Sequence, residues 1–464
     1  MTGTITHISA YYGTFVDAPA FDQPLRLREQ CLVAVDGSGR ICLVQEQCAD
    51  PLGCTLERFP HLSRDDVTLV AAPQCGFFFP GFVDTHIHAS QYPNCGVLGD
   101  DSTLLDWLSK YTFPTEAALS DLAWATQVYS AVIRRTLAAG TTTACYYTTI
   151  DTAAAQEMAR LCASSGQRAL VGKVCMDANS PEYYVETAKE AVEGTLALAR
   201  YIEDTLASPL VRPVVTPRFA PACSRELLDQ LGDISRANNW HVQTHLDENV
   251  NEIKWVGELF PEAQSYTAVY ADHGLLNDKT VLAHCVHLTT DEVELVRSAQ
   301  AGIAHCPESN TALMSGECPV VDLYNAGVQK IGLGTDVSAG ASCSILDAAR
   351  RALDVSRHRA MHSGGDKLSL AQCLHLGTMG GAKVLSMDQE IGSFDTGKHF
   401  DAQLVDLQSQ ESKLDIFPWQ VGAQDGKSAA GPQPLDTSEI VRKWFYLGDD
   451  RNVVRVWVKG NKVK

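Results

Sequence analysis

The stretch GFVDTHIH, residues 81–88, decides the fold, because it has the pattern of a buried strand that ends in two histidines. Helical periodicity follows from Leu119 to Ala139 and stops at Gly140, a suitable residue for the end of a helix. Side chains two residues apart on a strand point to the same side. We therefore expect His86 and His88 to face the same way at the carboxyl end of a strand that precedes a helix.

The same alternation of strand and helix continues along the chain. Further strand patterns lie at residues 141–149, 168–176, 211–219, 241–246, 280–286, 302–307 and 330–336. Helical patterns lie at residues 151–165, 181–205 and 344–358. Eight strands that alternate with helices predict an α/β protein with a (β/α)8 barrel, the fold called a TIM barrel.

Both ends of the chain have a different character from this central part. Short β patterns lie at residues 8–16, 31–36, 41–46, 392–406 and 454–463. A loop-like stretch rich in Gly, Ala and Pro covers residues 422–434. We expect residues 1–76 and 391–464 to form one small β-sandwich domain, with residues 77–390 as the inserted barrel.

Composition narrows the class of protein. The chain has 464 residues, and 37 basic against 56 acidic side chains leave a net charge of −19. Such a charge argues against a broad nucleic-acid surface, although it allows a neutral base as a small ligand. The 15 cysteines include no C-x-x-C pair, and neither a secretory signal nor an apolar run of about 20 residues is found. We predict a reduced, soluble, cytoplasmic protein without a membrane partner.

Polar residues at the ends of the predicted strands indicate a metal site. His245 ends the fifth strand and Asp336 the eighth, while His86 and His88 end the first. The carboxyl ends of barrel strands meet at one rim, where the active sites of such barrels lie. Imidazoles with one carboxylate suit Zn²⁺ or Fe²⁺. We therefore predict a metal held by His86, His88, His245 and Asp336.

Glu248 follows His245 by three residues and lies beyond the predicted strand. A carboxylate beside a metal, but not bound to it, can move protons for an activated water molecule. The alternative is a glutamate at the start of a helix, where the positive end of the dipole favours it. Taken alone, Glu248 would fit that alternative better.

Several motifs carry a family resemblance. PGFVDTHIH, QTHLDEN, LAHC and GLGTD resemble the metal-dependent amidohydrolase superfamily. HIHASQYPNCG, TPRFAPACS, IAHCPESN, GLGTDVSAG and FYLGDDRNV are similar to the motifs of those members that deaminate guanine. The resemblance runs from about Pro80 to the C-terminus. It implies a distorted barrel with a β-sandwich from both chain ends, one zinc per subunit, a homodimer, and hydrolysis of guanine to xanthine and ammonia.

The resemblance also implies a role for each matched residue. Its zinc ligands would be His86, His88, His245 and Asp336, the last of which would also act in catalysis. Glu248 would carry a proton from the attacking water to N3 of guanine, while hydroxide attacks C2. His284 would hydrogen-bond the reacting centre rather than the metal. The residues in contact with the base would be Gln91, Arg218, Phe219, His245, Glu248 and Asp336.

The residues that would hold the base suit a 6-oxopurine. Arginine is a common bidentate partner of the O6/N7 edge of guanine, so Arg218 would favour guanine over adenine. Gln91 offers both a donor and an acceptor, and Phe219 could stack on the ring. The alternatives are a salt-bridged arginine and a phenylalanine of the core. The chain departs from the family pattern at Ser90, Asp247 and Glu308, none of which replaces a metal ligand.

Other candidates carry less weight. We expect a structural role for His305, and a solvated helix face for His358 and His362, which lack the glutamate of H-E-x-x-H. Lys173 could bridge two metals if it were carboxylated, but the pattern indicates one metal. Two other functions stay open: an amidohydrolase for another aminated or halogenated heterocycle, and a non-catalytic barrel that serves as a scaffold.

Overall fold

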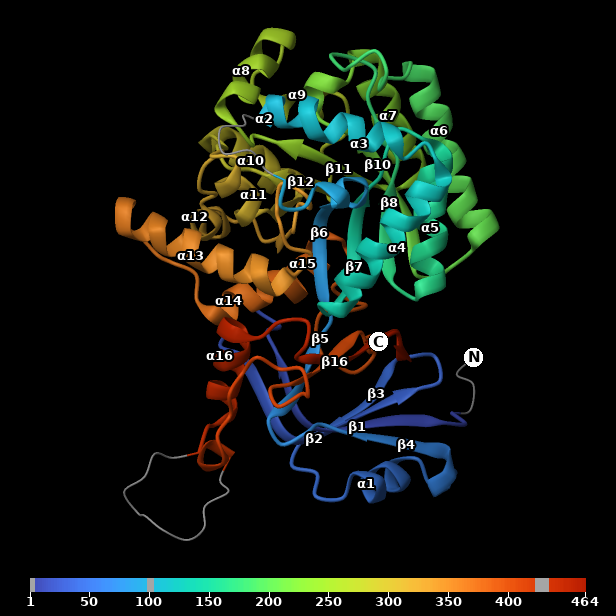
Figure 1. The fold of residues 1–464 in the computed structure, drawn as a ribbon, viewed down its shortest axis with the longest axis vertical. Helices are drawn as coiled ribbons and strands as arrows, with labels where there is room; N and C mark the ends of the chain where they lie inside the picture. The colour runs from blue at the N-terminus through green and yellow to red at the C-terminus, as the bar shows by residue number, and fades with distance from the viewer. Residues whose placement is uncertain (1–4, 98–103, 422–433) are drawn as a thin grey trace.

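The computed structural model describes residues 5–97, 104–421 and 434–464. Figure 1 shows a barrel with its surrounding helices and, below it, a sheet to which both ends of the chain contribute. Of the loop-like stretch at residues 422–434, all but the last residue lies outside the described part of the chain.

The barrel prediction is confirmed. Parallel strands follow one another in the order β6, β7, β8, β10, β11, β12, β13 and β14. Their bounds are Phe82–His88, Thr141–Tyr147, Arg168–Gly172, Val211–Pro217, His241–Leu246, Thr280–His284, Gly302–His305 and Ile331–Leu333. Several hydrogen bonds join the first strand to the last and to the residues after it, among them one from the Thr85 hydroxyl to the Leu333 carbonyl (2.8 Å) and one from the Asp336 amide to the His86 carbonyl (2.9 Å). These contacts bring the barrel close to closure.

Each of the four predicted helical segments contains a helix, and further helices surround the barrel. The larger ones are α4 (Leu122–Ala138), α5 (Thr152–Ser165), α6 (Ala188–Arg200), α7 (Arg225–Asn238), α8 (Val250–Leu259), α9 (Tyr266–Asp272), α10 (Thr290–Ala299) and α13 (Ile345–Ser363). The shorter ones are α2 (Leu104–Trp107), α3 (Phe113–Ala118), α11 (Pro307–Ala312), α12 (Val320–Asn325), α14 (Leu370–His375) and α15 (Gly381–Val384).

Two details of the predicted barrel segments are wrong. The helix expected from Pro181 begins at Ala188, because Thr187 and Glu190 form a reciprocal capping box that sets its start. The strand expected over residues 168–176 is divided at Lys173 into β8 and the short β9 (Val174–Cys175), which pairs only with β10. Both corrections are local, and neither changes the order of the strands.

The terminal sheet takes strands from both chain ends, as predicted. Its order is β17-β16-β15-β5-β1-β2-β3, with β4 paired to β1. The bounds are β1 Ile8–Asp17, β2 Arg26–Asp36, β3 Ile41–Gln45, β4 Val67–Ala71, β5 Gly76–Pro80, β15 Ala402–Asp406, β16 Val453–Val458 and β17 Asn461–Lys462. Strand β5 crosses the expected boundary at residue 76, because it pairs with β15 and β1. The domain bounds themselves stay a prediction.

Two helices of the terminal part did not show in the sequence patterns. They are α1 (Pro51–Arg58) and α16 (Thr437–Leu447). Helix α16 carries Trp444, whose buried ring lies 5.1 Å from the ring of Phe79 and 6.0 Å from that of Phe82. Phe79 belongs to the terminal sheet and Phe82 to the barrel, so Trp444 packs where the two meet.

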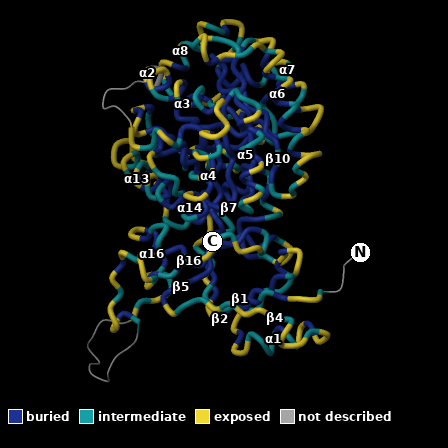
Figure 2. The backbone as a smooth tube through the Cα atoms, turned by 45° about the vertical axis from the view of Figure 1, so that its right-hand side comes forward, coloured by how far each residue is buried: buried dark blue, intermediate teal, exposed yellow. Residues whose placement is uncertain are grey.

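A buried ion pair also joins the terminal sheet to the barrel. Arg168 at the start of β8 donates to Asp401, just before β15, over 3.1 and 3.2 Å. Both side chains are almost fully shielded from solvent. Figure 2 shows the strands of the barrel as its most deeply buried part, with exposed segments mainly on the outer helices and loops.

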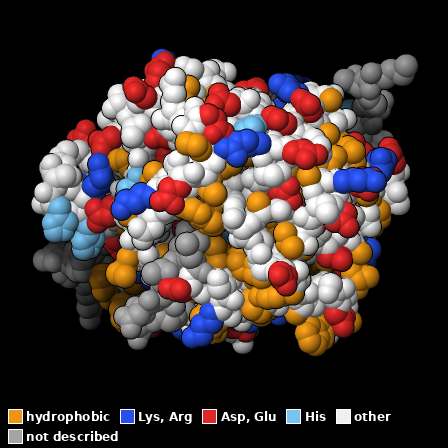
Figure 3. Space-filling model, turned by 90° about the horizontal axis from the view of Figure 1, so that it is seen from above, with side chains coloured by type: hydrophobic (Ala, Val, Ile, Leu, Met, Phe, Trp, Pro, Cys, Tyr) orange, Lys and Arg blue, Asp and Glu red, His pale blue; other side chains and the backbone are white. Residues whose placement is uncertain are grey.

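Acidic and basic side chains are interspersed over the face in Figure 3, with no broad basic area. Among the residues that the structure describes, no helix is both long and apolar enough to span a bilayer. All 15 cysteines are free.

Candidate active site

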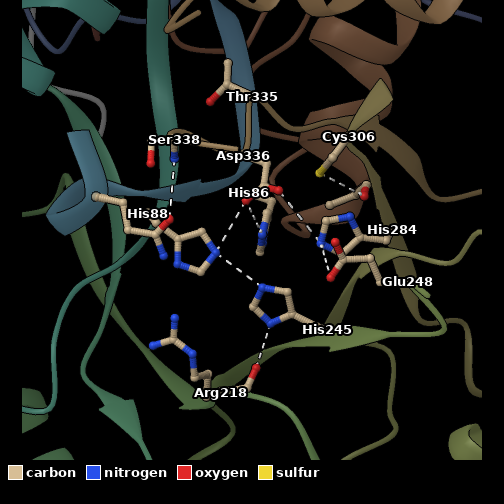
Figure 4. Close-up of polar contacts among 12 residues, drawn as sticks. His86, His88, Arg218, His245, Glu248, His284, Cys306, Thr335, Asp336 and Ser338 are labelled. Atoms are coloured by element: carbon tan, nitrogen blue, oxygen red, sulfur yellow. Dashed lines mark hydrogen bonds and ion pairs between the residues drawn. The ribbon is translucent and has the colours of Figure 1, made fainter. Parts of the chain in front are cut away.

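The predicted site residues meet at the carboxyl ends of the barrel strands. His86 and His88 end β6, His245 lies near the end of β11, and His284 ends β12, while Asp336 follows β14. Figure 4 shows these side chains pointing toward a common centre. The strand order of the barrel thus brings together residues that are up to 250 positions apart in the chain (336 − 86 = 250).

The distances between the candidate ligand atoms fit one metal ion. Nε2 of His86 lies 3.2 Å from Oδ1 of Asp336, and Nε2 of His88 lies 3.4 Å from the same oxygen. Nε2 of His88 is 3.2 Å from Nε2 of His245. Ligands about 2.0–2.1 Å from a tetrahedral zinc ion are roughly 3.3–3.4 Å from one another. These contacts therefore have the spacing of the edges of a zinc tetrahedron.

Hydrogen bonds orient two of the imidazole rings. Nδ1 of His245 is 2.6 Å from the carbonyl of Arg218, so this nitrogen carries the proton and leaves Nε2 with a free lone pair. Nδ1 of His284 is likewise held by Oδ1 of Asn310 at 2.9 Å. Nε2 of His86 is buried and forms no well-aligned hydrogen bond with the described residues, although Oδ1 of Asp336 lies 3.2 Å away. A cation would satisfy this nitrogen.

Burial and neighbouring charges set the protonation states of the centre. Burial lowers the pKa values of His88 and His245 well below the usual range, which favours the neutral form that binds metals. Burial would raise the pKa of Asp336, but the nearby His86, His284 and His88 outweigh it and hold that pKa well below its usual range. These directions for His88, His245 and Asp336 suit a set of metal ligands.

Two further residues lie close enough to the centre to be considered as ligands. His284 groups with His86 and His245, and Cys306 groups with His86 and Asp336, with ligand atoms within 4.8 Å of one another in each group. The sequence analysis did not consider Cys306, although this residue directly follows strand β13. Its thiol donates to the Ala304 carbonyl at 3.5 Å. Burial raises the pKa of that thiol well above its usual range.

Glu248 faces the centre from the loop after β11. Its Oε2 is 3.6 Å from Nε2 of His284, which in turn is 3.9 Å from Oδ2 of Asp336. Burial, with a smaller contribution from Asp336, raises the pKa of Glu248 well above its usual range. Asn249, not Glu248, caps helix α8. Glu248 is therefore placed toward the cavity, rather than in the first turn of the helix.

The backbone at the rim adopts unusual conformations. His284, Asp247 and Asp336 have φ values of 74°, 49° and 47°, in the left-handed region. Non-glycine residues are uncommon there, and such conformations tend to occur at functional sites. Here they turn the chain sharply at the ends of β12, β11 and β14, where the candidate side chains leave the strands.

A cavity opens beside this centre. The predicted residues Gln91, Arg218 and Phe219 line it together with the candidate centre. The sequence analysis missed four apolar residues of its wall, which are Trp107, Leu108, Leu313 and Ala339. They lie on separate helices and loops, and nothing in their local sequence distinguishes them from core residues.

The sequence analysis also missed Glu116, on the short helix α3. This carboxylate is fully buried and accepts hydrogen bonds from Arg218 (2.7 and 3.2 Å) and from Gln91 (3.0 Å). Arg218 is therefore both salt-bridged and part of the cavity wall. Its guanidinium carbon also lies 5.1 Å from the centre of the Phe113 ring.

The residues that were set aside lie elsewhere. His305 is buried and lines a second cavity, and it is not part of the wall of the cavity beside the candidate centre. Lys173 donates to both oxygens of Glu186, at 2.7 and 2.6 Å. His358 and His362 are exposed on α13. None of them is in a group of potential ligands with the rim residues in the described part of the chain.

Comparisons with known proteins agree with this site. The model of the amidohydrolase family matches residues 77–463. A guanine deaminase of Homo sapiens is 40% identical over 99% of this chain and 97% of its own length. One of Dictyostelium discoideum is 44% identical over 84% of this chain and 82% of its own. The crystal structure of a guanine deaminase from C. acetobutylicum with bound guanine matches with a TM-score of 0.87 and 30% identity, over 99% of this chain and 100% of that one.

The chain therefore belongs to the amidohydrolase family. Within that family it is similar to the guanine deaminases, which confirms the resemblance that the sequence motifs carry.

Proposed function

We propose that this protein is a guanine deaminase, which hydrolyses guanine to xanthine and ammonia. One observation carries the proposal: a single buried cavity contains the histidine and carboxylate centre, Glu248, and the pair of Arg218 and Gln91. The first group suits hydrolysis, and the second suits the polar edge of a 6-oxopurine. The similarity to guanine deaminases over nearly the whole chain supports the same reaction.

We propose zinc as the metal, with iron as the alternative that this ligand set also accepts. His86, His88, His245 and Asp336 would hold it, one ion per chain. When bound, zinc would supply Lewis-acid activation of a water molecule at neutral pH. The spacing of the ligand atoms and the unsatisfied, buried Nε2 of His86 support this assignment.

The residues around the centre would move the protons. Glu248 would take a proton from the attacking water and deliver it to N3 as C2 becomes tetrahedral. His284, with its Nδ1 held by Asn310, would present Nε2 to the attacking oxygen. Asp336 would help to orient that oxygen and to pass a proton to the departing amine. The buried position of Glu248 and its contact with His284 support the first of these roles.

The cavity wall would hold the base. The remaining N–H groups of Arg218 would donate to the acceptor edge of guanine, and Gln91 would pair with a ring nitrogen or the neighbouring amine. Phe219 is nearly buried and lines the cavity, where its ring could lie against the purine face. His245, Glu248 and Asp336 would contact the reacting side of the base.

The direct test compares ammonia release from guanine, adenine, cytosine and a chlorotriazine. We expect turnover of guanine alone at a rate comparable with metabolic enzymes, and formation of xanthine. Preference for another heterocycle would identify the first alternative, an amidohydrolase with a different substrate. A protein without bound zinc or iron, and without activity after metal addition, would identify the scaffold alternative.

A second prediction concerns Arg218→Ala. We expect a higher KM for guanine and a loss of discrimination against adenine, while the zinc content stays unchanged. Because Glu116 would be left buried without its cation, we also expect a loss of about 3–5 kcal/mol in the free energy of unfolding. Steady-state kinetics, metal analysis and urea unfolding measure the three effects. Unchanged kinetics in a folded variant would remove Arg218 from the site.

We further propose that the enzyme acts in the cytoplasm as a homodimer. The 15 free cysteines support a reducing compartment. The dimer rests on the family resemblance, and sedimentation at micromolar concentration tests it. We also propose that residues 77–390 form the barrel unit and that residues 1–76 and 391–464 form the other unit.

A further inference from the structure

A buried carboxylate lies behind the part of the cavity that would hold the base. Glu116 is fully shielded from solvent and accepts four hydrogen bonds. They come from Nη1 and Nη2 of Arg218 (2.7 and 3.2 Å), Nε2 of Gln91 (3.0 Å) and the hydroxyl of Tyr184 (2.7 Å). These donors belong to separate segments of the chain, so Glu116 connects them.

The contact with Arg218 determines which N–H groups remain for a ligand. Nη1 and Nη2 each donate to a different oxygen of Glu116, which makes the contact bidentate. Among the described residues, the structure records no protein acceptor for Nε of Arg218. The edge formed by Nε and the second proton of Nη2 therefore stays free, on a residue that lines the cavity.

The contact with Gln91 determines the orientation of its amide group. A carboxylate only accepts hydrogen bonds, so the nitrogen of Gln91, not its oxygen, must face Glu116. The amide oxygen then points elsewhere, and its nearest recorded donor is the Ser338 amide at 3.5 Å. Gln91 can thus offer this oxygen as an acceptor toward the cavity.

We propose that Glu116 is a positioning residue that makes the cavity selective for neutral 6-oxopurines. It fixes which edge of the Arg218 guanidinium faces the cavity, it leaves Gln91 with an acceptor there, and it neutralises the guanidinium. Guanine has an acceptor at position 6, whereas adenine has a donor there. Adenine would place its amine against the donors of Arg218 and leave buried polar groups unpaired.

The charge of Glu116 also affects whether the cavity prefers a neutral or an anionic ligand. The pair formed by Arg218 and Glu116 is neutral as a whole, and both side chains are almost completely buried. An arginine without this partner would attract an anionic ligand in a medium of low dielectric constant. The inference rests on the proposed function only in that it takes the ligand to be a purine base.

The test compares two purines, neutral hypoxanthine and anionic urate, on the zinc-loaded protein, and follows the change in their binding ratio from wild type to variant. In Glu116→Gln, we expect binding to shift toward urate by at least about tenfold relative to hypoxanthine, because the guanidinium loses its counter-charge. We also expect the KM for guanine to rise by about tenfold or more with a smaller change in kcat. Calorimetry gives the first result and steady-state kinetics the second.

Glu186→Gln is the matched control. It removes the charge of another glutamate, whose side chain is largely shielded from solvent and paired with the buried cation Lys173, but which lies outside the cavity wall. It is expected to change stability and to leave the ratio of urate to hypoxanthine binding as in the wild type. An unchanged ratio in folded, zinc-loaded Glu116→Gln would overturn the proposal.

Glu116→Asp provides a second variant if Glu116→Gln does not fold. It keeps the negative charge, but the shorter side chain moves the carboxylate away from Arg218 and Gln91. The KM for guanine should therefore rise, while the ratio of urate binding to hypoxanthine binding stays unchanged. An unchanged KM in this variant would overturn the positioning role. If the wild type binds hypoxanthine but does not deaminate guanine, only the proposed function fails. If the wild type binds neither purine, both proposals fail.

Discussion

Glu248→Gln is expected to keep its metal and to lose turnover of guanine by about 10²- to 10⁴-fold, the usual contribution of a general acid–base group. The glutamine has nearly the same shape, but it cannot take a proton from water or deliver one to N3. Glu248 lies 3.6 Å from His284 and faces the cavity, so no other carboxylate of the loop replaces it there. The measurements are kcat for guanine and zinc content per chain.

The control for this variant is Glu390→Gln. Glu390 pairs with Arg212 at 2.6 Å and lies near Arg168, at the amino end of the barrel strands. This change also replaces a paired glutamate, but it is distant from the rim, so kcat should stay close to that of the wild type. Loss of zinc from Glu248→Gln would mean that this carboxylate binds the metal, and the proposed proton transfer would then be wrong.

His245→Ala is expected to lose its metal, whereas His284→Ala is expected to keep it. His245 is oriented by the Arg218 carbonyl and has its Nε2 3.2 Å from that of His88, in the proposed ligand set. The activity of His245→Ala should fall by at least about 10³-fold, because metal activation contributes several kcal/mol to the barrier. Metal analysis of both purified variants, together with guanine turnover, checks this prediction.

A chelator provides the matching experiment on the wild type. Removal of the metal should abolish xanthine formation, and addition of zinc should restore it. His284 groups with His86 and His245 in the structure, so the outcome for His284→Ala decides between two ligand sets. A metal-free His284→Ala protein, with zinc retained in His245→Ala, would contradict our assignment.

Much of the barrel could be predicted because its signals are local. A run of apolar residues that ends in His86 and His88 specifies a strand, and the spacing of two residues places both histidine side chains on the same face of that strand. The segment around residues 181–187 could not be assigned in the same way. Its composition is compatible with a helix, but the capping box of Thr187 and Glu190 starts the helix later. Lys173 likewise interrupts a pattern that favours one continuous strand.

The residues of the candidate site also fall into those that local sequence could predict and those that it could not. Residues at strand ends could be predicted, since every strand of a parallel barrel ends at the same rim. Glu116 could not, because it lies on a short helix and is connected to the site only through Arg218 and Gln91. Trp107 and Leu313 reach the cavity wall from separate segments, and their sequence contexts resemble those of any core residue.

Periodicity along the chain is enough to predict the barrel, a second sheet with strands from both chain ends, and the residue types at the rim, because parallel strands share one carboxyl edge. Which groups face one another depends on how distant segments pack. The free edge of Arg218, the orientation of the Gln91 amide and the compensation of the guanidinium charge all depend on Glu116. These contacts span 102 positions from Glu116 to Arg218 and 25 positions from Gln91 to Glu116, so no local pattern encodes them.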